Sequence, residues 1–200
     1  MIEIIDYGMG NLRSVQKSLE GIGYKAAITS NPERIARANG VILPGVGAFA
    51  DAIDNLKTSG MIEAIREVVK NGKPLLGICL GMQLLMSSSE ENGLYQGLDL
   101  IDGEVLKIPS TVKVPHMGWN SLAINKNHRL LSGIEENSYF YFVHSYYVNP
   151  KNKGYIVAST QYGIDYCSVI AKDNIMGVQF HPEKSSSLGQ IILKSFGEMI

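Results

Sequence analysis

The sequence predicts one α/β domain with a mostly parallel central sheet, and two observations lead to this prediction. In the first half, short and almost continuously apolar runs alternate with segments of helical periodicity. Strands of this kind, alternating with helices, are typical of a parallel sheet that is covered on both faces. From about residue 98 the runs are shorter and richer in β-branched and aromatic residues, which indicates extra antiparallel strands. We expect residues 1–200 to form a single domain without a linker.

The first half is expected to contain four strands with helices between them. The expected strands are residues 2–5, 24–29, 41–43 (ended by Pro44 and Gly45) and 73–78. Apolar positions at helical spacing predict a helix from residue 12 to about residue 22, a second over 61–70, and a third run over 82–86. The polar run 87–91 is interpreted as a helix end that leads into a solvated loop.

The second half is expected to contain shorter strands and one closing helix. The expected strands are residues 105–108, 112–114, 121–124, 139–148, 155–160, 165–170 and 175–180. Apolar residues at 188, 191, 192 and 196 then follow helical spacing and predict the closing helix.

Composition excludes several classes of protein. Hydrophobic residues make up 45% of the chain and charged residues 18%, which is ordinary for a globular protein. The 18 basic and 19 acidic side chains nearly cancel, and no basic stripe suits a nucleic acid. The chain starts without a signal-peptide pattern, and no apolar stretch is long enough for a membrane helix. With only two cysteines, we expect a cytoplasmic protein without a disulfide framework.

The first candidate for chemistry is Cys79, at the junction of an expected strand and helix. It is flanked by Gly77 and Gly81 in a Gly-x-nucleophile-x-Gly pattern, the sequence form of a nucleophile elbow. Glycines suit this turn because larger side chains would clash with the packed strand and helix. The N-terminus of the following helix favours a thiolate. The alternative is a buried structural cysteine, which is how we interpret Cys167.

The second candidate is the pair His181 and Glu183, after the last expected strand. Residues two apart in extended backbone point the same way, and Pro182 favours that geometry. The carboxylate could orient the imidazole, which could then take the thiol proton and later deliver it to a leaving amine. The alternative is a solvated loop histidine beside a surface glutamate.

A glycine-rich loop follows the third expected strand and would emerge at the same edge of the sheet. Its residues Val46 and Gly47 could bring backbone N–H groups to a developing oxyanion, together with the amide of Leu80. The alternative is an ordinary turn between a strand and a helix.

Taken together, these segments resemble the class I glutamine amidotransferases over nearly the whole chain, with Cys79, His181 and Glu183 as the triad. Five segments narrow the resemblance to the glutaminase subunits of imidazole glycerol phosphate synthase, in histidine biosynthesis. They are residues 6–11 (DYGMGN), 43–49 (LPGVGAF), 77–85 (GICLGMQLL), 115–120 (PHMGWN) and 141–146 (YFVHSY).

The resemblance implies that Cys79 attacks the side-chain amide of glutamine to give a thioester and ammonia, after which water releases glutamate. It also implies that the amino-acid end of the substrate is held by Gly47, Gln83, Glu91, Ser145 and Tyr146. No cofactor is implied. The implied partner is a cyclase subunit, a (β/α)8 barrel in a heterodimer. It would use the ammonia on phosphoribulosyl-formimino-AICAR-phosphate to make imidazole glycerol phosphate and AICAR.

Two further expectations concern the partner. Interfaces favour aromatic and methionine anchors, so Met117, Trp119 and Asn120 are expected at the partner surface, as are Asn11 and Lys184. An inward-facing ring is the alternative for Trp119. Because Val46 stands between glycines, we hypothesise that partner binding flips this peptide and aims an N–H at the oxyanion.

Other functions remain open at this stage. A sibling amidotransferase could supply ammonia to another synthase, a cysteine hydrolase could use the same triad, and a non-catalytic subunit could bind a partner only. The histidines at 116, 128 and 144 lack the short spacing of a zinc site, so no metal site is expected.

Overall fold

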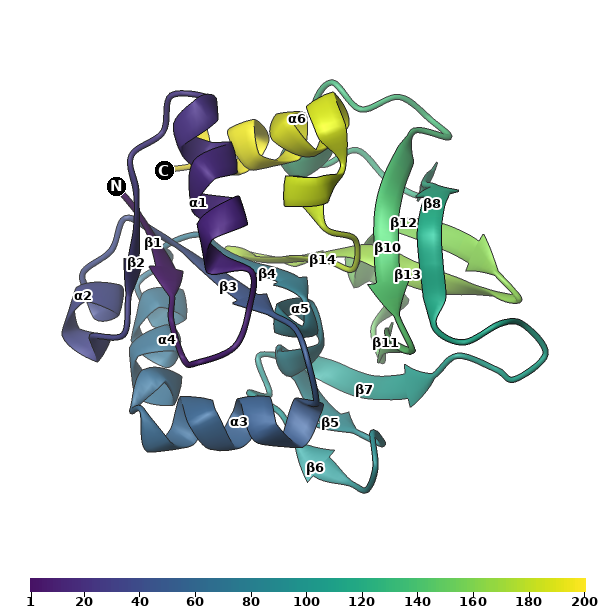
Figure 1. The fold of residues 1–200 in the computed structure, drawn as a ribbon, viewed down its shortest axis with the longest axis horizontal. Coiled ribbons are helices and arrows are strands. Elements are labelled where there is room, and N and C mark those ends of the chain that lie inside the picture. Colours follow the sequence, from purple (N-terminus) through teal and green to yellow (C-terminus); the bar gives the residue numbers. More distant parts are fainter.

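The computed structural model describes residues 1–200, whose centre is a twelve-stranded mixed sheet (Figure 1). The strand order along the sheet is β2-β1-β3-β4-β14-β13-β11-β7-β5-β6; β12 branches from β13, and β9 pairs with β12. A separate two-stranded sheet joins β10 and β8. The predicted architecture is therefore confirmed: a parallel centre, flanking helices and additional antiparallel strands.

The helices and strands have the following bounds. The α-helices are α1 Leu12–Gly21, α2 Pro32–Ala36, α3 Phe49–Thr58, α4 Met61–Lys70, α5 Leu80–Leu84 and α6 Ser186–Gly197. The short 3-10 helices are η1 Arg129–Leu131, η2 Lys153–Tyr155 and η3 Pro182–Lys184. The first strands are β1 Ile2–Ile5, β2 Ala26–Thr29, β3 Gly40–Gly45, β4 Leu75–Cys79, β5 Met86–Ser89, β6 Tyr95–Gln96 and β7 Ile101–Lys107. The others are β8 His116–Ser121, β9 Ala123–Ile124, β10 Tyr139–His144, β11 Tyr146–Pro150, β12 Ile156–Tyr162, β13 Ile164–Lys172 and β14 Ile175–Val178.

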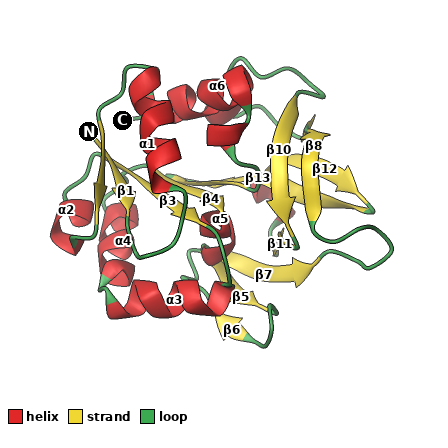
Figure 2. Cartoon of the chain, in the orientation of Figure 1, coloured by secondary structure: helices red, strands yellow, loops and turns green.

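The parallel strands β2, β1, β3, β4 and β14 separate two layers of helices (Figure 2). Successive strand residues point to opposite faces, so Ile42 joins the core under α1 and α6, whereas Val41 and Leu43 join the core under α2 to α5. Both cores are fully apolar at these positions, which explains why these strands lack a polar alternation. No helix has the length and hydrophobicity needed to cross a membrane.

Two predicted boundaries in the first half are wrong. Strand β3 continues through Pro44 and Gly45 instead of ending before them, and pairs with β4 up to Gly45 opposite Cys79. A proline fits there because β1 pairs with β3 only as far as Ile42, so its missing N–H costs no ladder bond to β1. Residues 86–89 form strand β5, not the end of a helix, because they pair with β7 and β6. Tertiary pairing here overrides local propensity.

Two predicted strands in the second half are also wrong in part. Residues 112–114 form a turn rather than a strand, with the Val112 N–H pointing at the Pro109 carbonyl at 3.4 Å. The expected strand 139–148 breaks at Ser145: β10 pairs with β8 in the small sheet, whereas β11 pairs with β7 and β13 in the large one. Periodicity alone cannot show that neighbouring segments belong to different sheets.

Candidate active site

Three neighbouring parallel strands end side by side and bring the predicted site segments together. Within the sheet, Gly45 of β3 lies opposite Cys79 of β4, and Ile78 lies opposite Val178 of β14. The residues that follow these pairs therefore emerge at one edge. This edge carries the Val46 loop, the start of α5 and the segment that leads to His181, as expected for a ligand site at the carboxyl ends of parallel strands.

The predicted nucleophile elbow has the backbone geometry that its glycines imply. Cys79 has φ 55° and ψ −110°, a conformation that a side-chain-bearing residue adopts only under constraint. A Cβ on Gly81 would lie 1.8 Å from the Leu43 carbonyl oxygen, and a Cβ on Gly77 would lie 2.6 Å from the Gly81 carbonyl oxygen. Both glycines are therefore required, because α5 starts in direct contact with strands β3 and β4.

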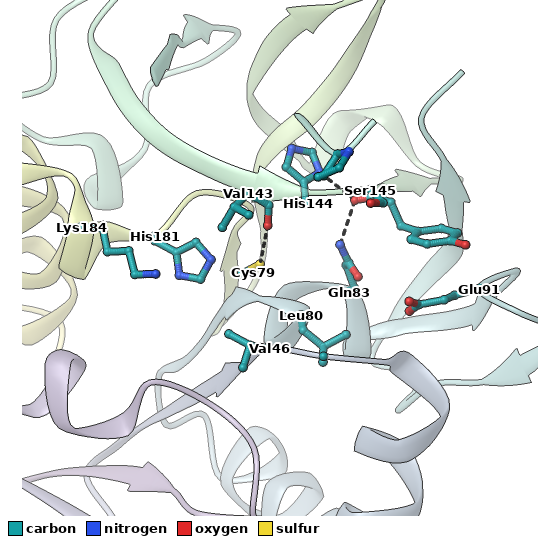
Figure 3. A pocket seen from close by; sticks show the side chains of 13 residues that line it. Val46, Cys79, Leu80, Gln83, Glu91, Val143, His144, Ser145, His181 and Lys184 are labelled. Atoms are coloured by element: carbon teal, nitrogen blue, oxygen red, sulfur yellow. Dashed lines mark hydrogen bonds between the residues drawn. The ribbon is translucent and has the colours of Figure 1, made fainter. Parts of the chain in front are cut away.

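His181 and Glu183 form a buried pair beside this cysteine. The His181 Nδ1 lies 2.9 Å from Glu183 Oε1, and the side chains are 3% and 1% exposed. Because a carboxylate only accepts, Nδ1 carries the hydrogen and donates it. The other ring nitrogen, Nε2, is buried without a hydrogen-bond partner, and the ring lies beside the Cys79 sulfur (Figure 3). The alternative of a solvated loop histidine is excluded.

The electrostatics of this pair favour a protonated imidazole. Burial alone would lower the pKa of His181, but its interactions with Cys79 and with Glu183 raise that pKa to about 10. Two nearby acidic groups therefore outweigh the desolvation penalty. A histidine held this way can donate a proton to a leaving amine, which is the role that the sequence predicted for it.

A pocket of about 410 Å³ opens over the cysteine (Figure 3). It is bounded on one side by the residues that follow β3 and β4, and on the other by the β10–β11 junction. The lining residues are Val46, Gly47, Cys79, Leu80, Gln83, Glu91, Pro115, Val143, His144, Ser145, Tyr146, His181 and Lys184. The predicted nucleophile, base, oxyanion residues and substrate residues thus share one cavity, with Glu183 behind His181.

Comparison with known proteins places this site in a family. The sequence profile described as "Glutamine amidotransferase class-I" matches residues 3–198. The chain belongs to the class I glutamine amidotransferase family. Among its relatives, the imidazole glycerol phosphate synthase subunit HisH of Moorella thermoacetica is 54% identical over 199 residues, covering 100% of this chain and 95% of the relative. The HisH subunit of Methanosarcina acetivorans is 55% identical over 201 residues, covering 99% and 98%.

Solved structures show the same fold at lower identity. The structure described as PurLQS from Thermotoga maritima superposes with a TM-score of 0.76 at 18% identity, covering 98% of this chain and 97% of that one. A structure described as a glutamine amidotransferase gives a TM-score of 0.75 at 17% identity and covers 98% of each chain. The class I amidotransferase fold is therefore shared with proteins whose sequences have largely diverged.

In this class I amidotransferase, the predicted substrate residues form the far wall of the pocket. The Gln83 Nε2 donates to the Tyr146 carbonyl at 2.9 Å, which ties α5 to β11. One Glu91 oxygen, Oε2, accepts the N–H of Phe49 at 2.9 Å and so caps the N-terminus of α3. Ser145 is half-buried at the junction of β10 and β11. Glu91 thus has a structural contact that its sequence context did not reveal.

Two residues of the amidotransferase site escaped the sequence analysis. Gln179 is fully buried, and its Nε2 lies 3.7 Å from the Cys79 sulfur. Tyr7 donates its hydroxyl to the Pro44 carbonyl at 2.9 Å and so supports the loop that carries Val46. The one available signal for Gln179 was a polar side chain at the end of an otherwise apolar strand.

The residues predicted for the partner surface divide into two groups. Met117 and Trp119 are 63% and 51% exposed on β8, so the inward-facing alternative for Trp119 is excluded. The Trp119 ring packs edge-on against Tyr141, and the Lys184 Nζ lies 5.9 Å from the centre of the same tyrosine ring.

Asn11 and Asn120 are half-buried and have local roles. Asn11 precedes α1 and accepts the Ser14 hydroxyl, while Asn120 donates its amide to the Gln161 carbonyl. No group of three or more histidine, cysteine or acidic side chains is arranged for a metal ion.

Proposed function

We propose that this chain is the glutaminase subunit of an imidazole glycerol phosphate synthase, and that Cys79, His181 and Glu183 hydrolyse glutamine. One observation carries the assignment of the residues. Cys79, whose backbone has a strained positive φ, lies beside His181. The Nδ1 of His181 is held by the buried carboxylate of Glu183. The curated relatives, at 54% and 55% identity, are named as HisH subunits of that synthase.

In the first half-reaction, the Cys79 thiolate attacks the side-chain amide carbon of glutamine. The C–N bond breaks as His181 passes its Nε2 proton to the departing nitrogen, leaving ammonia and a thioester on Cys79. Glu183 keeps the imidazole in one orientation and stabilises its positive charge.

In the second half-reaction, neutral His181 takes a proton from water, which attacks the thioester carbon. The C–S bond breaks, and glutamate leaves as the thiolate is restored. Each tetrahedral intermediate carries an oxyanion, and the donors we assign to it are the Leu80 N–H at the start of α5 and the Val46–Gly47 loop, which line the pocket. Val46 is 42% exposed and Gly47 has φ 99°, so this loop has room to change conformation.

The proposal extends to a partner, because relatives are named as subunits of a synthase. We assign the partner as a cyclase subunit, a (β/α)8 barrel that receives the ammonia in a heterodimer. The exposed Met117 and Trp119 on β8, with Lys184 beside the pocket, provide an apolar surface with one basic group next to the active-site mouth. Partner binding would then flip the Val46 peptide and complete the oxyanion site.

The test is glutamate release from glutamine by the purified chain, alone and with a matched cyclase subunit and its nucleotide substrate. We expect strong release only in the complex, and none from Cys79→Ala. Release that persists in Cys79→Ala would remove the proposed nucleophile. An isolated chain that is as fast as the complex would refute the loop hypothesis.

The same assay separates the competing functions. Cleavage of peptides without any partner would indicate a cysteine hydrolase. Glutamate release that does not respond to the cyclase, but responds to another ammonia-dependent synthase, would assign the chain to a sibling amidotransferase. A non-catalytic subunit would release no glutamate under any of these conditions.

A further inference from the structure

A buried polar network outside the triad connects β8, β10 and β13. His116, His144 and Tyr166 are 3%, 6% and 2% exposed. The His116 Nδ1 lies 3.0 Å from the Tyr166 hydroxyl and 3.2 Å from His144 Nε2, and that nitrogen lies 3.1 Å from the same hydroxyl. Buried polar side chains are costly unless every hydrogen bond is made, so the direction of each bond can be worked out.

The tautomer of His144 is fixed by a backbone carbonyl. Its Nδ1 lies 2.8 Å from the Tyr146 oxygen, which can only accept, so Nδ1 carries the hydrogen. Burial lowers the pKa of His144 to about 3, which leaves the ring neutral at pH 7. The remaining nitrogen, Nε2, is therefore an acceptor.

The tautomer of His116 is fixed from the opposite end by Asn120. The Asn120 amide orientation is set because its nitrogen donates to the Gln161 carbonyl at 3.1 Å and its oxygen accepts the Ser121 N–H at 2.8 Å. That amide nitrogen also lies 3.4 Å from His116 Nε2, which must accept. The His116 Nδ1 therefore carries the hydrogen, and Tyr166 can accept from it while donating to His144.

The Tyr146 carbonyl continues this chain into the active site. It also accepts from Gln83 Nε2 at 2.9 Å, and the same nitrogen donates to Gln179 Oε1 at 3.1 Å. With its oxygen committed, the Gln179 amide must turn its nitrogen outward, and that nitrogen lies 3.7 Å from Cys79 Sγ. Every side-chain amide and ring in the path thus has a single consistent orientation.

We propose that this chain of hydrogen bonds holds the Gln179 N–H against the Cys79 sulfur. Gln179 is then a positioning residue for the glutaminase reaction, and Tyr166, His144 and Gln83 position Gln179. The inference rests on the proposed function for the reaction itself. The Gln179 N–H stabilises the Cys79 thiolate and directs it toward the pocket, whereas a hydrogen-bond acceptor at the same place would not.

Two variants separate the donor from the shape of the side chain. Gln179→Glu keeps the shape and an oxygen for Gln83 but turns an acceptor toward the sulfur, and Gln179→Met removes both polar atoms. In the partner complex we expect kcat to fall by about 30-fold in both, with KM changed less than threefold, because a positioning hydrogen bond to a charged group is lost. Tyr166→Phe, at a residue four hydrogen bonds away from Gln179 along the chain, should lower kcat by about threefold.

A second readout does not depend on turnover. Alkylation of Cys79 by iodoacetamide in the isolated chain at pH 7, followed by mass spectrometry of the Cys79 peptide, measures thiolate reactivity directly. We expect it to slow by about tenfold in Gln179→Glu and Gln179→Met. The matched control is Tyr24→Phe, which loses a hydroxyl bond to the Lys194 carbonyl far from the site and should alkylate like wild type.

The outcomes distinguish this inference from the function on which it rests. Equal alkylation rates in wild type and both folded Gln179 variants would overturn the inference, even if Cys79→Ala has abolished glutamate release. Slower alkylation in Gln179→Met but not in Gln179→Glu would also overturn it, because shape rather than the donor would then matter. Persistent glutamate release by Cys79→Ala would overturn the proposed function, whatever the alkylation rates.

Discussion

The parallel and antiparallel parts of the sheet contribute to the pocket in different ways. From the parallel part, the contribution is backbone geometry: Cys79 has a positive φ, and Gly81 allows α5 to touch the Leu43 carbonyl. From the antiparallel part, it is polar groups at and after the β10–β11 junction, namely Ser145 at the bend and the Tyr146 carbonyl at the start of β11, which accepts from Gln83. The reacting group is thus positioned by strain and close packing, whereas the opposite wall is positioned by hydrogen bonds.

The comparison predicts that substitutions on the parallel side of the pocket lower kcat more than substitutions on the antiparallel side. The largest effect is expected at Glu183. In Glu183→Gln the amide can donate to His181 Nδ1, which moves the hydrogen to Nε2 and removes the base. We expect kcat for glutamate release in the complex to fall by about 100- to 10,000-fold. Steady-state kinetics measure this effect.

The matched substitution on the opposite wall is Ser145→Ala. We expect mainly an increase of KM, by about tenfold or less, because we propose Ser145 as a substrate-binding contact and not as a reacting group. If Ser145→Ala lowers kcat as much as Glu183→Gln does, the proposed division between the two walls is wrong.

The second prediction concerns the close packing at the elbow. An added Cβ in Gly81→Ala would overlap the Leu43 carbonyl, so the helix or the strand must shift. We expect a loss of about 3 kcal/mol in the free energy of unfolding, together with impaired alkylation of Cys79. Urea unfolding followed by circular dichroism measures the free energy.

The control is Gly21→Ala at the end of α1, where the new methyl group meets nothing within 4 Å. We expect it to change stability by about 0.5 kcal/mol, in the stabilising direction. A Gly81→Ala variant as stable as Gly21→Ala would show that the elbow does not depend on this contact.

The same difference explains what the sequence could predict. The parallel strands are buried on both faces, so a continuous apolar run was enough to predict β4. The glycines on either side of Cys79, Gly77 and Gly81, then predicted the elbow. The nearness of His181 to Cys79 could be expected because His181 comes after the strand next to β4. These features depend on residues that are close in sequence or on neighbouring strand ends.

The remaining features depend on long-range pairing that periodicity does not encode. Residues 86–89 became a strand because β7 lies beside them, and the break at Ser145 divides one apolar run between two sheets. Gln179 was missed because its role depends on Gln83, a residue nearly one hundred positions away. The sequence contains these residues but does not show which of them meet.

The third prediction tests the surface of the small sheet. Trp119→Ala should weaken binding of the cyclase subunit by about 10- to 30-fold, because an exposed aromatic ring packed on Tyr141 is a suitable anchor. Titration calorimetry with the purified partner measures the affinity. Leu94→Ala is the control, since Leu94 is 84% exposed but lies between β5 and β6, outside the proposed interface. Equal weakening in both variants would contradict the assigned surface.

The smallest expected effect is a pH dependence of stability that arises from His181. Its pKa is raised from 6.5 to about 10, so the folded protein keeps a proton that the unfolded chain releases above pH 6.5. The resulting stabilisation is complete below about pH 6.5 and is lost as the pH rises toward 10. Wild type should therefore lose more stability between pH 7 and pH 9.5 than Cys79→Ala, in which one cause of the raised pKa is absent.

We expect the additional fall in the melting temperature of wild type to be about 2–4 °C over this range. Other groups that titrate there, such as tyrosines and lysines, are the same in both proteins, so the difference isolates the pair. Differential scanning calorimetry at both pH values provides the comparison, and the NMR titration of the His181 ring provides an independent check. Identical falls in the two proteins would mean that Cys79 does not raise the pKa of His181 in the resting enzyme. In that case the strained elbow would place the sulfur without activating it, and activation would have to come with substrate or partner.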